Sequence, residues 1–228
     1  MSSSSSHKKD HGEENNNDDS IWIFAYGSLC WRPGFSYDEV RTGHVNGFMR
    51  RFWQGNVTHR GSPSKPGRVA TLVPCEDAQT YGCAYRIKRN QLSILEYLEN
   101  REMKLGGYVC VWTVFFPYEK SDGKHSKDGV EEEEEEEDED DDDDDDEEDE
   151  EIVEDDDDVG FPCLCYIALE GNSLWLGEDS EMSIATQISE AKGICGENQD
   201  YLLSLYKYMK TNFPLHYDEH LEEIMKHL

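Results

Sequence analysis

An uninterrupted acidic segment is the feature that most limits how this chain can fold. Between positions 131 and 158 every residue is Asp or Glu except Ile152 and Val153, which makes 26 acidic residues and no basic one. Such a segment cannot enter a hydrophobic core, because its charges repel one another and it has almost no apolar surface to bury. We therefore expect a disordered acidic insert at about 119–160, which separates two blocks of ordinary sequence, 21–118 and 161–228.

The rest of the chain has an ordinary charge and no obvious export or membrane signal. The formal net charge is −31, but outside the acidic segment 26 acidic residues face 21 Lys and Arg, a net charge of −5. Residues 1–20 are polar, without the apolar stretch of a signal peptide, and no window of the chain is apolar enough to span a membrane. The 7 cysteines are irregularly spaced and odd in number. We expect a disordered tail at 1–20, a single domain over 21–228, no membrane partner, and a cytosolic location with free thiols.

Hydrophobic patterning predicts strands in the first block and helices in the last. The predicted strands are 21–25, 45–53, 69–73, 81–87, 108–116 and 163–169. The predicted helices are 91–101, 182–191, 200–210 and 218–228. Strands followed by helices are typical of an α+β fold, here a curved sheet or small mixed β-barrel with peripheral helices.

The first strand runs directly into Tyr26-Gly27-Ser28-Leu29. A glycine after a strand lets the backbone approach a ligand closely and present N–H groups as donors. Such donors suit a carboxylate or a developing oxyanion. An ordinary turn beneath a core strand is the alternative interpretation.

Basic and aromatic residues alternate in a second region, made of Arg50-Arg51-Phe52-Trp53-Gln54-Gly55, His59-Arg60-Gly61 and Lys65-Pro66-Gly67-Arg68-Val69. This pattern also occurs in nucleic-acid-binding proteins. Here the bases are few and phosphate would repel so acidic a chain, so we expect no nucleic-acid partner. The better hypothesis is a set of loops around a pocket for a small anion. Local pairing of each arginine with a carboxylate is the alternative.

The segment 91–102 places a carboxylate among apolar residues. At 100° per residue Glu102 falls near the centre of one apolar arc, formed by Leu92, Ile94, Leu95 and Leu98. Burial there would raise the pKa of Glu102, as a general acid or base working near neutral pH requires. Alternatively, the helix ends before Glu102 and the carboxylate pairs with Arg101 or Lys104 in solvent.

Together these segments resemble the ChaC branch of the γ-glutamylcyclotransferases, the glutathione-specific enzymes. The resemblance rests on residues 24–29, 50–55, 59–61, 65–69 and 97–102, continues at Gly107-Tyr108, and resumes at 165–168. It leaves out the tail and the acidic insert. The link formed by Met103, Lys104 and Leu105 is longer than in many relatives.

The resemblance implies a cyclotransferase barrel that converts glutathione into 5-oxoproline and cysteinylglycine without a metal or other cofactor. It implies Glu102 as the catalytic residue that moves the proton. The residues implied to bind the substrate are Ala25, Tyr26, Gly27, Ser28, Leu29 and Cys30. Further candidates for the pocket wall are Arg51, Arg68, Tyr108 and Tyr166.

Two other functions fit parts of the sequence. One is a cyclotransferase for other γ-glutamyl amines or peptides, which uses the same chemistry on a different substrate. The other is an acidic binding module, in which the insert makes salt-sensitive contacts with basic proteins. Metal sites are poorly supported: Cys163 and Cys165 fit buried thiols on one strand face, and His216 and His220 fit a surface pair on the last helix.

Overall fold

The computed structural model describes residues 20–104, 106–118 and 159–228. The expected tail, except for Ser20, and the expected insert up to residue 158 lie outside these described residues. Within the described ranges, no helix is both long and apolar enough to cross a membrane.

Five strands close into a barrel in the order β1-β3-β2-β4-β5. Only the β1–β5 contact is parallel among the barrel pairs described. The strands are β1 Ser20–Ala25, β2 Glu39–Asn56, β3 Gly67–Lys88, β4 Tyr108–Pro117 and β5 Phe161–Ala168. The predicted α+β class with a small barrel is therefore confirmed, and Cys163 and Cys165 are buried thiols inside β5, as expected.

The prediction of two separate strands at 69–73 and 81–87 is wrong, because β3 runs unbroken from Gly67 to Lys88. Pro74 and the acids after it suggested a break. In the structure Pro74 pairs with Phe48, directly beside a bulge in which residues 75–78 of β3 lie opposite the single residue Gly47 of β2, whose φ is +80°. A proline is tolerated next to a bulge because the ladder hydrogen bonds are already interrupted there.

The alternation of side chains along β1 supplies two hydrophobic clusters. Ile21 and Ile23 belong to the cluster under α1 (Leu92–Leu98), whereas Phe24 and Tyr26 belong to the larger cluster that fills the barrel and contacts the later helices. The strand is therefore buried on both sides, and the turn that follows it emerges from the middle of the molecule.

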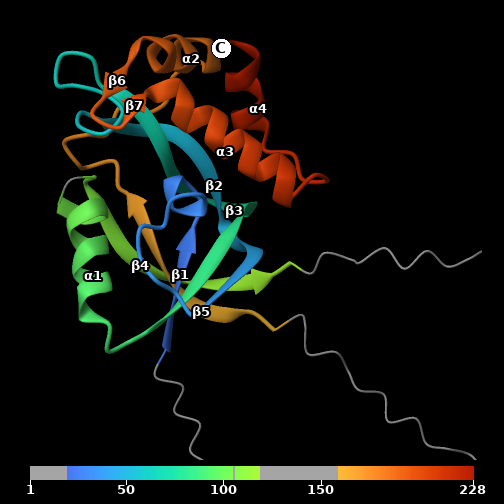
Figure 1. Ribbon diagram of the computed structural model, residues 1–228. Helices are drawn as coiled ribbons and strands as arrows, with labels where there is room; N and C mark the ends of the chain where they lie inside the picture. Colours follow the sequence, from blue (N-terminus) through green and yellow to red (C-terminus); the bar gives the residue numbers. More distant parts are fainter. Residues whose placement is uncertain (1–19, 105, 119–158) are drawn as a thin grey trace, which may run out of the picture.

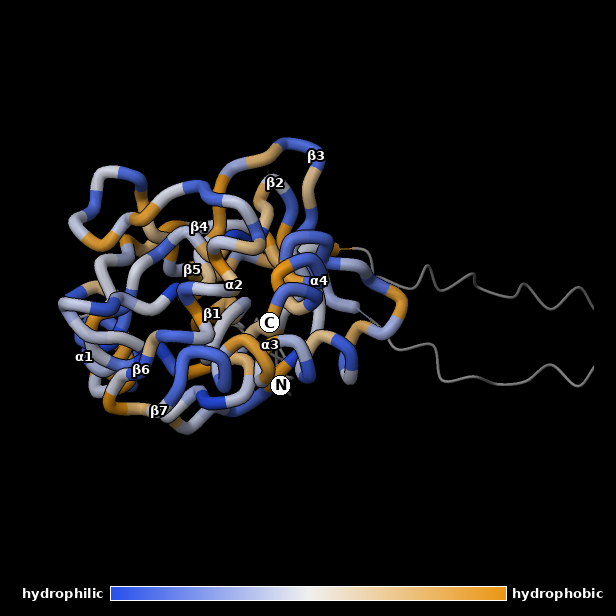
Figure 2. The backbone as a smooth tube through the Cα atoms, turned by 90° about the horizontal axis from the view of Figure 1, so that it is seen from above, coloured by the Kyte–Doolittle hydropathy of each residue, from blue (hydrophilic) through white to orange (hydrophobic). Residues whose placement is uncertain are grey.

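Three helices gather over one end of the barrel while α1 lies alone beside it (Figure 1). They are α2 Glu181–Glu190, α3 Asn198–Asn212 and α4 Glu219–Lys226, and the two-residue strands β6 Lys192–Gly193 and β7 Gly196–Glu197 lie between α2 and α3. Seen from above, α1, β6 and β7 lie to one side of the molecule (Figure 2). Both α2 and α3 contact β3. The four predicted helices are thus all present, two of them capped by the side chains of Ser180 and Asp218.

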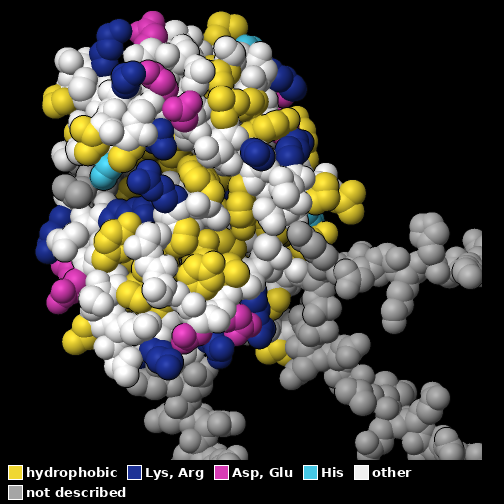
Figure 3. Space-filling view, in the orientation of Figure 1, with side chains coloured by type: hydrophobic (Ala, Val, Ile, Leu, Met, Phe, Trp, Pro, Cys, Tyr) yellow, Lys and Arg dark blue, Asp and Glu magenta, His cyan; other side chains and the backbone are white. Residues whose placement is uncertain are grey.

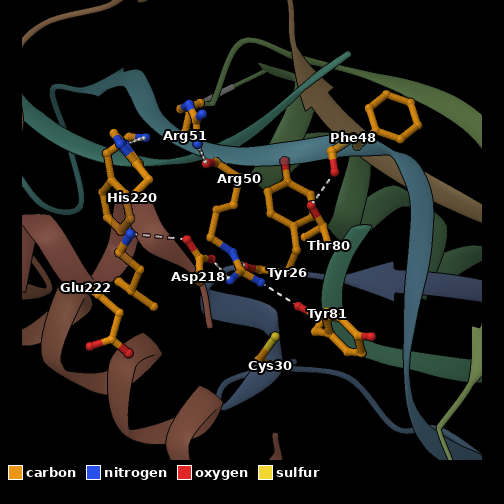
Figure 4. A network of polar contacts seen from close by, with 12 residues as sticks. Tyr26, Cys30, Phe48, Arg50, Arg51, Thr80, Tyr81, Asp218, His220 and Glu222 are labelled. Carbon is orange, nitrogen blue, oxygen red and sulfur yellow. Dashed lines mark hydrogen bonds and ion pairs between the residues drawn. The ribbon is translucent and has the colours of Figure 1, made fainter. Parts of the chain in front are cut away.

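A buried arginine ties α4 to the barrel (Figure 4). Arg50 is 3% exposed, and its Nη1 pairs with Asp218 at the start of α4. Its Nε donates to the carbonyl oxygen of Tyr26 at 3.0 Å, and its Nη2 donates to that of Tyr81. A buried guanidinium needs such partners, because an unpaired buried charge is costly. The contact with Tyr26 also fixes the chain where β1 ends.

The expectation of an exposed histidine pair on the last helix is wrong. His220 is 5% exposed, and its Nε2 accepts a hydrogen bond of 3.0 Å from the backbone N–H of Phe52. His216 precedes α4 and stacks on Tyr81, with ring centroids 3.7 Å apart. The apolar face of α4 packs against the barrel, so that His220 points inward rather than into solvent.

Candidate active site

A cavity of about 360 Å³ opens beside the end of β1. Its wall combines the turn after β1, the start of β3, the segment after α1, the start of β4, a tyrosine of β5, and one residue of α3. These parts are far apart in the sequence, and closure of the barrel brings them together.

Four tyrosines form the inner part of this cavity: Tyr26, Tyr108, Tyr166 and Tyr201. The Tyr108 hydroxyl donates to the carbonyl oxygen of Ala70 at 2.7 Å, and the Ala70 N–H donates to the Tyr201 hydroxyl at 3.2 Å. Burial raises the pKa of all four phenols, and the nearby Glu102 carboxylate adds to the effect. They therefore act as neutral hydrogen-bonding groups.

The turn after β1 presents backbone to the cavity. The short 3₁₀ helix η1 (Ser28–Cys30) is closed by the Cys30 N–H, which donates to the Gly27 carbonyl oxygen at 2.9 Å. The N–H groups of Gly27 and Ser28 stand at the start of this turn, so no carbonyl oxygen within the turn accepts a hydrogen bond from them. They are therefore available to a ligand. A Cβ on Gly27 would come within 2.7 Å of the Tyr201 hydroxyl, so the close approach requires glycine.

Glu102 lies on the cavity wall in a π-helical turn, η2 (Glu99–Lys104), that continues α1. Its side chain is only 17% exposed, and burial raises its pKa while the Arg101 guanidinium opposes that rise. The two sequence interpretations of Glu102 were burial among apolar residues and pairing with Arg101 or Lys104 in solvent. The structure combines them, because the carboxylate pairs with Arg101 and does so inside the cavity.

The predicted apolar arc is wrong at Leu92, which is 66% exposed. Leu92 is the first residue of α1 and falls at the edge of the arc, away from the buried Ile94 and Leu98. The π-helical turn begins only at Glu99 and is wider than an α-helix, so the 100° projection does not hold from there to Glu102.

Arg101 joins Glu102 to the turn after β1. Its Nε pairs with Glu102 Oε1 at 2.9 Å, and its Nη2 donates to Ser28 Oγ at 2.7 Å. Its Nη1 donates to the Tyr97 hydroxyl at 2.9 Å and to the carbonyl oxygens of Arg32 and Pro33 at 3.0 and 3.1 Å. The rigid fork of one guanidinium therefore fixes the carboxylate relative to the backbone donors.

The mouth of the cavity is basic. Arg32, His59 and Arg60 line it, and burial together with Arg101, Arg60 and Arg32 lowers the pKa of His59. Figure 3 shows Lys and Arg side chains gathered beside a histidine on this face, between the regions of α1 and of β6 and β7.

Three residues that the sequence analysis grouped with the pocket lie outside its wall. Cys30 is buried beneath the turn, where its Sγ contacts the Ala25 carbonyl oxygen at 3.2 Å. Arg51 stacks on Trp53 and points to the opposite side of β2 from Arg50, as successive strand residues do (Figure 4). Arg68 is 4% exposed, and its guanidinium binds Gln187 and the carbonyl oxygens of Phe52 and Gly177.

The structure brings the other predicted site residues together. Ala25, Tyr26, Gly27, Ser28, Leu29, Tyr108, Tyr166 and Glu102 all line the cavity. Sequence reasoning missed Tyr201 and Cys195, which reach it from the second block. Nothing in the local sequence marks Tyr201 as a cavity residue, because its spacing along the helix is that of any residue on the buried face.

The family model described as ChaC-like protein matches residues 21–228. The glutathione-specific γ-glutamylcyclotransferases 1 of Rattus norvegicus and Homo sapiens are each 37% identical over 207 residues, 90% of this chain and 77% of theirs. A crystal structure of a γ-glutamyl cyclotransferase specific to glutathione from yeast superposes with a TM-score of 0.69 at 22% identity, covering 91% of this chain and 97% of that one.

Proposed function

The chain belongs to the ChaC-like family, and on that premise we propose that it is a glutathione-specific γ-glutamylcyclotransferase. It is an enzyme that converts glutathione into 5-oxoproline and cysteinylglycine. The observation that best supports the proposal is the mostly buried Glu102, joined through Arg101 to the turn of Gly27 and Ser28.

In the proposed reaction the substrate attacks itself. The α-nitrogen of the γ-glutamyl group forms a bond to its own γ-carbonyl carbon and closes a five-membered ring, and the bond from that carbon to the cysteinyl nitrogen then breaks. Because the nucleophile is tethered to the electrophile, the protein accelerates the reaction chiefly by holding a near-attack geometry.

Two protons must move from the attacking nitrogen to the departing one. The α-nitrogen starts as an ammonium with three protons and ends as a lactam nitrogen with one. The cysteinyl nitrogen starts as an amide with one proton and ends as an ammonium with three. Glu102, as a carboxylate, accepts a proton from the ammonium and later delivers one to the leaving nitrogen. Its raised pKa suits both transfers.

The turn after β1 has the second role in this proposal. The N–H groups of Gly27 and Ser28 bind the γ-glutamyl group and stabilise the oxyanion that forms on its γ-carbonyl oxygen. Tyr26, Tyr108 and Tyr166 surround the ring as it closes, and their hydroxyls stay neutral. Glu102 is the one carboxylate in the cavity wall among the described residues.

We place this activity in the cytosol. All seven cysteines lie in the described part of the chain, and each is a free thiol, which fits a reducing compartment. We also propose that the acidic insert makes weak, salt-sensitive contacts with basic proteins as a secondary property.

The decisive test is Glu102→Gln. We expect no release of 5-oxoproline from glutathione, with glutathione binding and the melting temperature largely kept, because the amide has nearly the same shape but cannot accept the proton. Glu99→Gln is the matched control: it removes the same charge from the same turn, but Glu99 is 52% exposed, pairs with Lys104 and lies off the cavity wall. Turnover by Glu102→Gln at the rate of the control would remove Glu102 from the mechanism. Comparing glutathione with γ-glutamyl-alanine separates the proposed activity from that of a broader cyclotransferase.

A further inference from the structure

The charges of the cavity do not balance. Among the described residues, its wall contains one carboxylate, that of Glu102, and three arginines, Arg32, Arg60 and Arg101. Glu102 and Arg101 neutralise each other, so two positive charges remain at the mouth of the cavity in a chain whose formal net charge is −31. His59 adds no third charge near neutral pH, because burial and these arginines lower its pKa. The surplus indicates that the ligand brings a negative charge to the mouth.

Of the three arginines, Arg32 and Arg60 have guanidinium N–H groups that remain free to bind a ligand. Arg101 is fully used by Glu102, Ser28, Tyr97 and two carbonyl oxygens. Arg60 uses only Nη1, which donates to the carbonyl oxygen of Glu197 at 2.9 Å, among the contacts of the described residues. Within the same ranges, the Arg32 guanidinium has no hydrogen bond or ion pair, and its residue is exposed.

The backbone that carries Arg60 is fixed before any ligand arrives. Asn56 Oδ1 accepts hydrogen bonds from the N–H groups of Thr58, His59 and Arg60 at 3.3, 2.8 and 2.8 Å. The carbonyl oxygens of Thr58 and His59 then accept the N–H groups of Ile194 and Cys195, each at 2.9 Å. A preorganised site loses less entropy on binding than a flexible loop would.

The proposed substrate matches this arrangement, so the inference rests on the proposed function. With the γ-glutamyl group beside Glu102, the cysteinylglycine part extends toward the mouth, and two extended residues span about 7 Å. That part ends in a carboxylate, the group that an arginine fork binds with two parallel hydrogen bonds. We propose that Arg60, together with Arg32, binds the glycine carboxylate of glutathione and thereby selects glutathione over γ-glutamyl compounds that lack this carboxylate.

Glutathione is preferred because a neutral group in place of its glycine carboxylate leaves the N–H donors of Arg60 and Arg32 without a partner. A site built for a hydrogen-bonding group discriminates strongly against analogues that lack it. For one charged contact we expect about a 10- to 100-fold preference for glutathione over its glycinamide analogue.

The test uses binding and turnover in parallel. Calorimetry on Glu102→Gln measures the Kd of glutathione and of γ-glutamyl-cysteinyl-glycinamide without turnover, and the same pair is measured after adding Arg60→Ala. Initial rates on both compounds give the ratio of kcat/KM for the enzymes with Glu102 intact. We expect Arg60→Ala to reduce both ratios to near one, Arg32→Ala to reduce them less, and Arg60→Lys to keep part of the preference.

Lys65→Ala is the matched control. It removes one positive charge from the same β2–β3 loop, but Lys65 is 65% exposed, pairs with Glu190 and lies off the cavity wall, so the ratio should not change. Arg60→Lys retains the charge, so it reports on the subsite even if Arg60→Ala fails to fold. An unchanged ratio in the folded Arg60 variants, or a wild-type ratio near one, overturns the subsite while leaving the cyclotransferase intact. No 5-oxoproline from glutathione, together with an Arg60-dependent binding preference, overturns the proposed reaction while leaving the subsite intact.

Discussion

Arg101→Gln tests whether one side chain positions the proposed base, Glu102, against the turn of Gly27 and Ser28 that we propose binds the substrate. The substitution removes the pairing with Glu102 and the contact with Ser28 together, leaving Glu102 held by the backbone of η2. A misplacement of about 1 Å at a reacting group costs on the order of 100-fold in rate, and we expect kcat to fall by about that factor.

Folding should suffer much less than catalysis. The partners of Arg101 are partly exposed, since its own side chain is 18% exposed and its carbonyl partners lie near the cavity mouth, so water replaces part of what is lost. We expect a loss of about 2 kcal/mol in the free energy of unfolding at most, which lowers the melting temperature by roughly 4–8 °C.

The pH dependence of kcat/KM separates two effects of Arg101 on Glu102: its effect on the pKa of the carboxyl group and its effect on the position of that group. Arg101 lowers the pKa of Glu102 against the effect of burial, so its removal raises that pKa. The base must be ionised to accept a proton, so the acidic limb of the kcat/KM profile moves to higher pH in Arg101→Gln. Arg101→Lys keeps the charge but cannot reach Glu102, Ser28 and the carbonyl oxygens at once, so its limb should stay near that of the wild type while kcat remains low.

The assay is the initial rate of 5-oxoproline formation across pH, with the melting temperature measured on the same samples. A kcat for Arg101→Gln at its best pH close to the wild-type value would show that Glu102 does not depend on Arg101 for its position. An acidic limb that stays in place would show that the ion pair does not set the pKa of the base.

Two further perturbations address the rest of the chain. Deleting 119–160 and joining β4 to β5 by a short linker should preserve activity. The reason is that Phe115 and Phe161 are already paired, so the ends of the two strands are adjacent. Loss of activity in a folded deletion variant would show that the insert takes part in function. The second concerns His220, whose pKa is lowered by burial and by Arg51 against the opposing effects of Glu181 and Asp218. The unfolded state therefore binds more protons than the folded state as pH falls through about 6.5, and stability should decrease there. In His220→Gln, melting temperatures measured across this range should depend less on pH than in the wild type; an equal slope in both proteins would contradict this.

Much of the architecture could be predicted from local sequence, because the spacing of apolar residues in each helix or strand indicates which of its faces is buried. The alternation in β1 and the three- and four-residue spacing in α3 identified strand and helix correctly. The errors arose where a distant partner overrides local chemistry. Pro74 is accepted inside β3 because the β2–β3 register shifts directly beside it, and His220 is buried because α4 packs on the barrel.

The sequence by itself determined that 131–158 cannot join a core, that a glycine turn follows the first strand, and that Glu102 is the carboxylate most worth testing. Composition, periodicity and the order of the motifs are properties of the chain alone. Tertiary structure decided which arginine does what: Arg50 and Arg68 are held inside, Arg101 holds Glu102, and Arg60 opens to the cavity. All four are the same residue type, so the neighbours brought by barrel closure, and not the residue itself, distinguish their roles.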